Sequence, residues 1–483
     1  MDRRKFLTAS LATSCTVLAP PSGFARSAAH GRLRVTLHPD RRGNAIAADF
    51  TGLSYETSQL SDPMFFSPAN GTLAGFHRHL GAAGVLRIGG NTSEYGVWSP
   101  TAAPVRPVPE ALGPDTGHHA PPRRPVTPLA VRNLRSFLEL SGWRLIYGLN
   151  MGSESPETVA DEAAYVASIM GKRLIAFQLC NEPDLFSRNG LRPASYDYHQ
   201  FAAEWRRYSR AVRKRVPRAP FAGPDTANSE WLVSFAKEQK DEVAFLSQHY
   251  YAEGPPTDPS MTLERLLRPS PRLDTAFRAA AAARRDTGLP FRMAETNSCY
   301  QGGKPGVSDT FASALWAADL MYQLAQAGAV GVNFHGGGYG WYTPVAGTPA
   351  NGFVARPIYY GMLLFAVAGA GRLVVTEMDG EAAGSAAAYG LMSDDDELKV
   401  VVLNKSLDED VTVTVNASGA KKASVLRLVA PRADEATDVT FGGSVVGNYG
   451  GWAPTVAETP AVRRGMLVFQ MPKASGALVT LAK

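Results

Sequence analysis

Short apolar segments recur along most of the chain, and most of them are followed by a turn and a helical pattern. Segments that are apolar at nearly every position are typical of strands in a parallel sheet, because helices cover both faces of such a sheet. The eight segments are Ala48–Glu56, Gly84–Gly90, Arg144–Asn150, Leu174–Pro183, Pro220–Asp225, Glu242–Tyr251, Pro290–Thr296 and Ala329–Gly338. Eight strand-and-helix units over roughly 320 residues predict a (β/α)8 TIM barrel.

After about residue 371 the pattern changes to short alternating strands separated by Gly, Asp and Asn turns, which is typical of a β-sandwich. One alternating segment, Arg32–Leu37, precedes the barrel, and we expect it to join the sandwich. The predicted fold class is therefore α/β, with a (β/α)8 barrel plus a C-terminal β-sandwich completed by an N-terminal strand. The expected limits are 31–45 for that strand, 46–368 for the barrel and 369–483 for the sandwich.

The N-terminal segment, residues 1–29, has the pattern of a signal peptide. Arg3 and Arg4 precede an almost uncharged stretch that runs to Ala19, and small residues flank a cleavage point before Arg26. The paired arginines favour a twin-arginine signal over a general secretory signal. We therefore expect an exported protein, periplasmic or extracellular. No later stretch stays apolar for about 18 residues, so we expect no membrane span.

Composition and charge exclude some functions. The chain has 483 residues and a formal charge of +5, without any Lys/Arg-rich block, so we expect no nucleic-acid binding. Beyond the leader only Cys180 and Cys299 remain, which give no disulfide framework. The spacing of the histidines, including His118-His119, His249 and His335, fits no tight ligand set, so we expect no metal and no cofactor.

Two glutamates stand at the ends of predicted strands. The fourth strand ends in Asn181-Glu182-Pro183, and the seventh ends in Glu295 followed by Thr296. Barrel active sites form at the C-terminal strand ends, and strands four and seven lie on opposed parts of the ring. Both glutamates can therefore point into one cleft. Paired carboxylates of this kind suit glycosidic bond cleavage, with one acting as acid and the other as nucleophile or base.

Longer motifs resemble a known family. The stretch AETNSCYQGGKPGVSDTF (Ala294–Phe311), with FTGLSYETSQLSDP, LRIGGNTSEY, QHYY and HGGGYGWYTPV in matching order, resembles glycoside hydrolase family 79 of clan A, the β-glucuronidases and heparanases. The resemblance covers nearly the whole chain after the leader. It implies a retaining exo-β-glucuronidase acting on terminal β-linked glucuronic acid, with or without a 4-O-methyl group. Its implied partners are glucuronic-acid-containing glycosides or polysaccharides, and we expect a monomer.

The resemblance also implies roles for individual residues. Glu182 resembles the acid/base and Glu295 the nucleophile. Tyr250 resembles the tyrosine that hydrogen-bonds the nucleophile, and Arg87 the arginine beneath it, which is equally well explained as a structural ion pair. The implied sugar-binding residues are Glu56, Asn91, Thr92 and Asn181 for hydroxyl groups and Tyr300, Gln301, Gly302 and Tyr342 for the glucuronate carboxylate. Lys304 either assists that carboxylate electrostatically or is a solvated loop lysine.

Two alternatives remain open. One is an endo-acting, heparanase-like enzyme, which needs an open cleft with basic walls. The long loops Ser99–Pro128 and Ala252–Arg268 follow predicted strands and favour a cleft closed at one end, although Arg123-Arg124 in the first loop could instead contact sulfate. The other is a carbohydrate-binding protein with an inactive barrel, which the presence of both glutamates disfavours.

Overall fold

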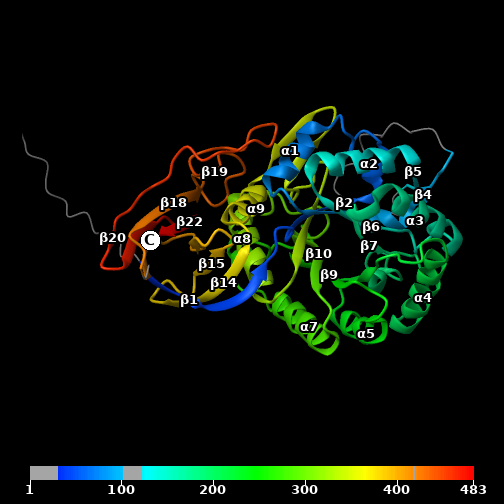
Figure 1. The fold of residues 1–483 in the computed structure, drawn as a ribbon, viewed down its shortest axis with the longest axis horizontal. Helices are drawn as coiled ribbons and strands as arrows, with labels where there is room; N and C mark the ends of the chain where they lie inside the picture. Colours follow the sequence, from blue (N-terminus) through cyan, green and yellow to red (C-terminus); the bar gives the residue numbers. More distant parts are fainter. Residues whose placement is uncertain (1–30, 102–121, 417–418) are drawn as a thin grey trace, which may run out of the picture.

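The computed structural model describes residues 31–101, 122–416 and 419–483. The predicted leader and most of the loop Ser99–Pro128, with His118 and His119, lie outside these residues. Two bodies stand side by side: a helix-wrapped barrel and a curled sheet, with α8 (Phe311–Gln326) and α9 (Pro357–Ala368) between them (Figure 1). Among the described residues, no helix is both long enough and apolar enough to cross a membrane.

Eight parallel strands form the barrel, which confirms the predicted fold class. They are β2 (Thr51–Glu56), β3 (Val85–Gly89), β6 (Arg144–Gly148), β7 (Leu174–Gln178), β8 (Ala222–Thr226), β9 (Phe245–Glu253), β10 (Phe291–Cys299) and β11 (Gly331–Gly336). Their order is β7-β6-β3-β2-β11-β10-β9-β8, and a parallel bridge between Phe177 and Phe221 joins the two ends. Nearly all strand residues are buried, because the outer helices cover the face that the barrel interior does not.

A helix follows each barrel strand. These helices are α1 (Gly71–His79), α2 (Pro128–Ser141), α3 (Pro156–Met170), α4 (Tyr198–Arg215), α5 (Ser229–Gln239), α7 (Pro271–Thr287), α8 and α9, with a short α6 (Leu263–Leu267) before α7. Capping residues mark where several of them begin. Thr127, Ser155 and Ser270 each accept a backbone N–H, and a proline occupies the first turn of each of those helices.

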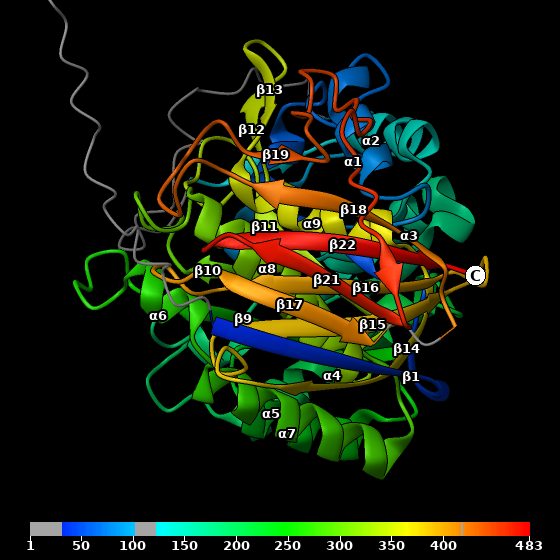
Figure 2. The same cartoon turned by 90° about the vertical axis from the view of Figure 1, so that its left-hand side faces the viewer.

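The second body is one hydrogen-bonded sheet of ten strands that curls around its own apolar core (Figure 2). Its order is β19-β18-β22-β16-β15-β14-β1-β17-β21-β20. The strands are β1 (Gly31–Ile46), β14 (Gly371–Asp379), β15 (Ala386–Ser393), β16 (Leu398–Asn404), β17 (Val411–Asn416), β18 (Lys422–Val429), β19 (Thr440–Phe441), β20 (Val462–Arg463), β21 (Met466–Met471) and β22 (Ser475–Ala482). β1 pairs antiparallel with β14 and parallel with β17, so the N-terminal strand does complete this body.

Two pairs of short strands decorate the barrel rim. β4 (Gly96–Trp98) pairs with β5 (Arg124–Val126), and β12 (Val345–Thr348) forms a hairpin with β13 (Gly352–Ala355). Both pairs belong to connections that leave the C-terminal ends of barrel strands. The connections at this end are therefore the elaborate ones, as expected for the end that holds a barrel's active site.

Candidate active site

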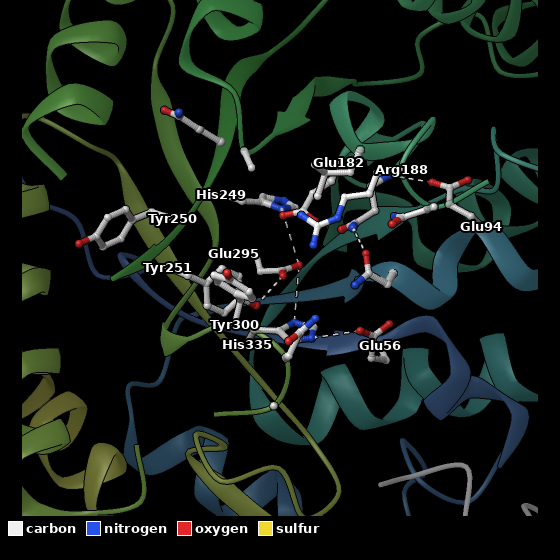
Figure 3. A pocket seen from close by; sticks show the side chains of 18 of the residues that line it. Glu56, Glu94, Glu182, Arg188, His249, Tyr250, Tyr251, Glu295, Tyr300 and His335 are labelled. Atoms are coloured by element: carbon white, nitrogen blue, oxygen red, sulfur yellow. Dashed lines mark hydrogen bonds and ion pairs between the residues drawn. The ribbon is translucent and has the colours of Figure 1, made fainter. Parts of the chain in front are cut away.

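A pocket of about 470 Å³ opens at the C-terminal ends of the barrel strands. Its lining includes both predicted catalytic glutamates, and side chains from the connections after β2, β3, β7, β8, β9, β10 and β11 converge on it (Figure 3). Of the predicted sugar-binding residues, seven line the pocket: Glu56, Asn91, Asn181, Tyr300, Gln301, Gly302 and Tyr342.

Glu295 lies on β10 beside a register irregularity between Met293 and Glu295, of the kind that re-aims a side chain. One carboxylate oxygen, Oε2, accepts a hydrogen bond from Arg87 Nη1 at 2.5 Å, and Oε1 accepts one from the Tyr251 hydroxyl at 2.7 Å. Burial by itself would raise the pKa of Glu295, but His335, His249 and Arg87 outweigh it and hold the pKa well below its usual range. Glu295 is therefore an ionised carboxylate, as a nucleophile requires.

Glu182 follows β7 and has a left-handed backbone, with φ of 47° and ψ of 58°. A non-glycine residue in this region carries strain, which is common at functional sites. Its N–H donates to the Asp225 carbonyl at 2.8 Å, and Pro183 then opens a short 3-10 turn, Pro183–Leu185. This turn leads the chain away, so the side chain remains at the pocket wall, where it is 8% exposed.

His249 links the two glutamates to a third carboxylate. Its Nδ1 lies 3.0 Å from Glu182 Oε1 and 3.9 Å from Glu295 Oε2, and its Nε2 lies 3.0 Å from Asp225 Oδ1. Burial alone would lower the pKa of His249, but Asp225, Glu295 and Glu182 outweigh it and raise the pKa to about 10. At neutral pH the ring is a cation that holds the facing carboxylates together.

Arg87 is the hub beneath the pocket. Besides Glu295 it donates to Asp225 at 2.6 Å and to Asn181 Oδ1 at 2.8 Å, and its remaining donors go to the side chains of Gln178 and Ser54. The guanidinium is fully buried, and every direction of its planar fork is used. Arg87 therefore pairs both with Glu295, the predicted nucleophile, and with Asp225, so its two sequence interpretations do not exclude each other.

Glu56, at the end of β2, has contacts with protein groups at both of its carboxylate oxygens. Its Oε2 accepts hydrogen bonds from the backbone N–H and the hydroxyl of Thr92, and its Oε1 lies 3.2 Å from His335 Nε2. Thr92 thus acts by orienting Glu56 and is absent from the pocket lining. His335 in turn contacts Ser54 at 2.9 Å, which leaves Glu56 directed into the pocket.

The prediction for Tyr250 is wrong, because Tyr251 makes the hydrogen bond to Glu295. Successive strand side chains point to opposite faces, so if His249 faces the barrel interior, Tyr251 does as well and Tyr250 does not. Figure 3 shows Tyr250 directed away from Glu295. Its hydroxyl lies near Ser270 at the start of α7 instead. Two adjacent tyrosines at a strand end gave no sequence signal for choosing between them.

The prediction for Lys304 as a substrate-binding residue is also wrong. Its ammonium donates to the Asp258 carbonyl at 2.6 Å, and the residue is absent from the pocket lining. The reason is geometric: Gln301, Gly302 and Gly303 all have positive φ, so the chain turns sharply before Lys304. The glycine-rich turn keeps Tyr300, Gln301 and Gly302 at the pocket and carries Lys304 to its outer side.

Several site residues were not predicted. Asp225 reads as a turn residue after Pro224, although it is fully buried and Arg87 holds its pKa low against the effect of burial. Glu94 accepts the backbone N–H of Asn181 at 2.7 Å and that of Gly152 at 2.5 Å. Its only sequence signal was membership of the LRIGGNTSEY motif. His249 and His335 were weighed only as metal ligands, and their position at strand ends was the signal that could have identified them.

Glu182, His249 and Glu295 each offer a ligand atom within 4.8 Å of the others, which is a spacing that a metal ion could bridge. In the structure, however, His249 faces carboxylates through both ring nitrogens. The observed contacts are those of an ion-pair chain. That the protein needs no metal or cofactor stays a prediction from the sequence.

The fold and the paired carboxylates are those of a barrel glycoside hydrolase. Residues 388–478 match the C-terminal β domain of glycosyl hydrolase family 79, so the resemblance to that family is confirmed. The chain is 26% identical over 397 residues to a β-glucuronidase of Aspergillus niger, covering 74% of this chain and 70% of that protein.

Two further proteins extend the comparison. A β-glucuronidase of Neurospora crassa is 26% identical over 321 residues, which cover 58% of this chain and 55% of that protein. A crystal structure of a 4-O-α-L-rhamnosyl-β-D-glucuronidase from Fusarium oxysporum 12S superposes with a TM-score of 0.76 at 19% identity, covering 93% of this chain and 100% of that chain. At that identity the likeness concerns the fold.

Proposed function

We propose that the chain is a retaining exo-β-glucuronidase that removes terminal β-linked glucuronic acid from glycosides by double displacement. The observation that carries the reaction type is the proximity of one carboxylate oxygen of Glu182 and one of Glu295, within 4.8 Å. Retaining enzymes keep their carboxyl groups about 5–5.5 Å apart, whereas inverting enzymes leave about 6.5–9.5 Å for a water. The β-glucuronidases of Aspergillus niger and Neurospora crassa support the substrate class.

In the first step Glu295 attacks the anomeric carbon, and Glu182 gives its proton to the departing oxygen. In the second step Glu182 takes a proton from the water that attacks the same carbon, and Glu295 is released. Arg87 and Tyr251 keep Glu295 ionised before the attack and accommodate it as a leaving group afterwards. His249 stabilises the negative charge that passes from one glutamate to the other.

The sugar contacts follow from the pocket wall. The Glu56 carboxylate is positioned to accept hydrogen bonds from two hydroxyl groups of the sugar. Asn181 is positioned to contact the 2-hydroxyl of the sugar beside Glu182, the acid/base. The glucuronate carboxylate is assigned to the Tyr300 and Tyr342 hydroxyls and the backbone of Gln301-Gly302, which are polar donors without fixed charge. A 4-O-methyl group on the glucuronate belongs to the same proposal.

A panel of aryl β-glycosides tests the substrate class, with the glucuronide expected to react and the glucoside and galactoside expected to be inert. Glu295→Gln should lower kcat by about a thousandfold or more. Glu182→Gln should lose far less activity on an aryl leaving group that departs without protonation than on an alkyl one. NMR of the first product should detect the β-anomer, and an α-anomer would show inversion instead.

An endo-acting, heparanase-like enzyme is the second candidate. Arg123, which that hypothesis uses to contact sulfate, is paired with Glu154, and this favours the exo hypothesis. Chain shortening of heparan sulfate without turnover of an aryl glucuronide would reverse the preference. Export through residues 1–29 and a monomeric state are further proposals, testable by fractionating cells and by size-exclusion chromatography with light scattering.

A further inference from the structure

Asp225 is a buried aspartate that stands beneath the pocket without lining it. Its exposed fraction is 1%. It lies in β8 at a register irregularity between Pro224 and Thr226, and its φ of 61° places it in the left-handed region. A residue with a Cβ adopts this conformation at a cost, and such residues gather at functional sites. A buried charge and a strained backbone at one position therefore point to a functional role.

The backbone of Asp225 holds the proposed acid/base. Its carbonyl accepts a hydrogen bond from the Glu182 N–H at 2.8 Å, and Glu182 has a left-handed backbone as well. The turn Pro183–Leu185 begins at the next residue, so this hydrogen bond fixes the last point before the chain turns away from the pocket. It therefore sets the direction in which the Glu182 side chain leaves the backbone.

The carboxylate of Asp225 leads to both glutamates. Its Oδ2 accepts a hydrogen bond from Arg87 Nη2 at 2.6 Å, and Arg87 Nη1 donates to Glu295 at 2.5 Å. Its Oδ1 lies 3.0 Å from His249 Nε2, and His249 Nδ1 lies 3.0 Å from Glu182 Oε1. Each oxygen of Asp225 thus orients a cation, and that cation in turn contacts one of the two glutamates.

Asp225 also balances charge beneath the pocket. Two cations, Arg87 and His249, are buried among three carboxylates, those of Asp225, Glu182 and Glu295. When Asp225 and Glu295 are ionised, they neutralise the two cations, and Glu182 is free to carry the proton that it donates to the departing oxygen. Without the charge of Asp225, one buried cation would be compensated only by ionising Glu182, which removes that proton.

We propose that Asp225 is the positioning residue of the catalytic pair. Its carbonyl and His249 place Glu182, Arg87 places Glu295, and its charge leaves Glu182 able to hold the proton for the leaving group. Asp225 acts only through these groups and contacts no sugar. The inference rests on the proposed retaining mechanism and adds to it a residue that governs both of its carboxylates.

Asp225→Asn keeps the size of the side chain and removes its charge. An amide has one acceptor oxygen, so it can satisfy Arg87 or His249 but not both. On an aryl glucuronide kcat should fall by about ten- to a hundredfold, because both carboxylates are misplaced. KM should change by less than about threefold, since the proposed sugar contacts come from other strands. An alkyl glucuronide should lose about tenfold more than the aryl one, because its departing oxygen needs the proton of Glu182.

Asp319→Asn is the matched control for a merely structural effect. Asp319 is also buried and paired with a cation, Lys405, but it lies on α8 and is absent from the pocket lining. This variant should lower the melting temperature and leave kcat per active site unchanged. Active sites are counted by the burst of phenol from an activated 2-fluoro glucuronide, which excludes unfolded enzyme. An unchanged kcat per active site in Asp225→Asn, or a loss confined to KM, would overturn the proposal.

A measurement without substrate separates this inference from the proposed function. NMR of isotope-labelled histidine follows the titration of His249, which is assigned by the signal that His249→Asn removes. Three carboxylates face the ring: Glu182 after β7, Asp225 on β8 and Glu295 on β10. Removing one of these charges in Asp225→Asn should lower the pKa of His249 by about 1 to 3.

The two hypotheses can then fail separately. An unchanged His249 titration in Asp225→Asn, with glucuronides still hydrolysed at the wild-type rate, would reject the positioning role and leave the proposed function standing. Cleavage of a different aryl glycoside in place of the glucuronide would reject the proposed function. The same kcat ratios, measured on that glycoside, would then support or reject the role of Asp225.

Discussion

At the scale of single residues, the hydrogen bond from Tyr251 to Glu295 gives a sharp comparison between neighbours. Tyr251→Phe removes a donor to a buried carboxylate at 2.7 Å and should lower kcat by about ten- to a hundredfold. Tyr250→Phe removes a hydroxyl that faces Ser270 and should cost much less. Steady-state kinetics on an aryl glucuronide decide between them. A larger loss in Tyr250→Phe would contradict the register of β9, which places Tyr251 beside Glu295.

His249 gives a pH-dependent prediction. Its pKa is raised from the usual 6.5 to about 10, so the stability that its charge contributes is complete below about pH 6.5 and is lost as pH rises towards 10. The melting temperature of the wild type should therefore fall between pH 7 and 10 more steeply than that of His249→Asn. Burial raises the pKa of Glu94 to about 8, so ionisation of Glu94 also lowers the stability of the protein over part of this range. This contribution is the same in both proteins. Melting temperatures that fall equally with pH in the two proteins would contradict the raised pKa of His249.

Site residues could be predicted from the sequence where a chemically suitable side chain stands at the end of a predicted strand. Glu182 and Glu295 stand out because a carboxylate after an apolar run is unusual and the two share one barrel end. The register of β9 decides which of Tyr250 and Tyr251 faces the barrel interior, and two identical side chains do not reveal that register. Asp225 became significant only through its ion pair with Arg87, 138 positions away in sequence.

At the scale of elements, the close approach of α8 and α9 is a point of tight packing. A Cβ at Gly361 would collide with the carbonyl of Ala314 on α8. Gly361→Ala should therefore destabilise the protein by about 1–3 kcal/mol, although alanine favours helices. Gly71→Ala, at the start of α1 with no atom near its Cβ, is the control and should be neutral or stabilising. Urea unfolding measures both, and equal effects would contradict the packing argument.

The strands were easier to predict than two of the helices. Apolar runs between turns located all eight barrel strands, since a parallel sheet buries both faces of each strand. α9 was not among the predicted helices, because PIYYGMLLFAVA is apolar on nearly every side and shows no amphipathic period. Its surroundings explain this pattern: it lies between the barrel and the curled sheet (Figure 1), and ten of its twelve residues are buried. α5 was also not predicted, although Asn228 caps it.

At the scale of the whole molecule, β1 places an N-terminal segment inside the C-terminal sheet. Lying between β14 and β17, it joins the start of the chain to strands more than 300 positions later. The alternation in Arg32–Leu37 predicted a strand, and its place in the sheet followed from the absence of a partner in the barrel. The curled sheet that stands beside the barrel is therefore built from segments that precede and follow the barrel in the sequence.

The contact between the two bodies is anchored by a buried charge pair. Asp319 on α8 accepts hydrogen bonds from the Tyr389 hydroxyl at 2.5 Å and from Lys405 Nζ at 2.7 Å, both in the curled sheet. Asp319→Ala leaves the Lys405 ammonium largely buried and unpaired, which should cost about 3 kcal/mol in the free energy of unfolding.

The double variant Asp319→Ala/Lys405→Met removes both charges and should recover more than half of that loss, because most of the cost lies in the stranded ammonium. Glu139→Ala in α2 breaks the exposed pair with Arg135 and serves as the control, with an expected cost of at most about 0.5 kcal/mol. Chemical denaturation of all four proteins supplies the measurement. If the double variant is no more stable than Asp319→Ala, the pair is not what joins the barrel to the sheet, and the apolar faces of α8 and α9 must do so alone.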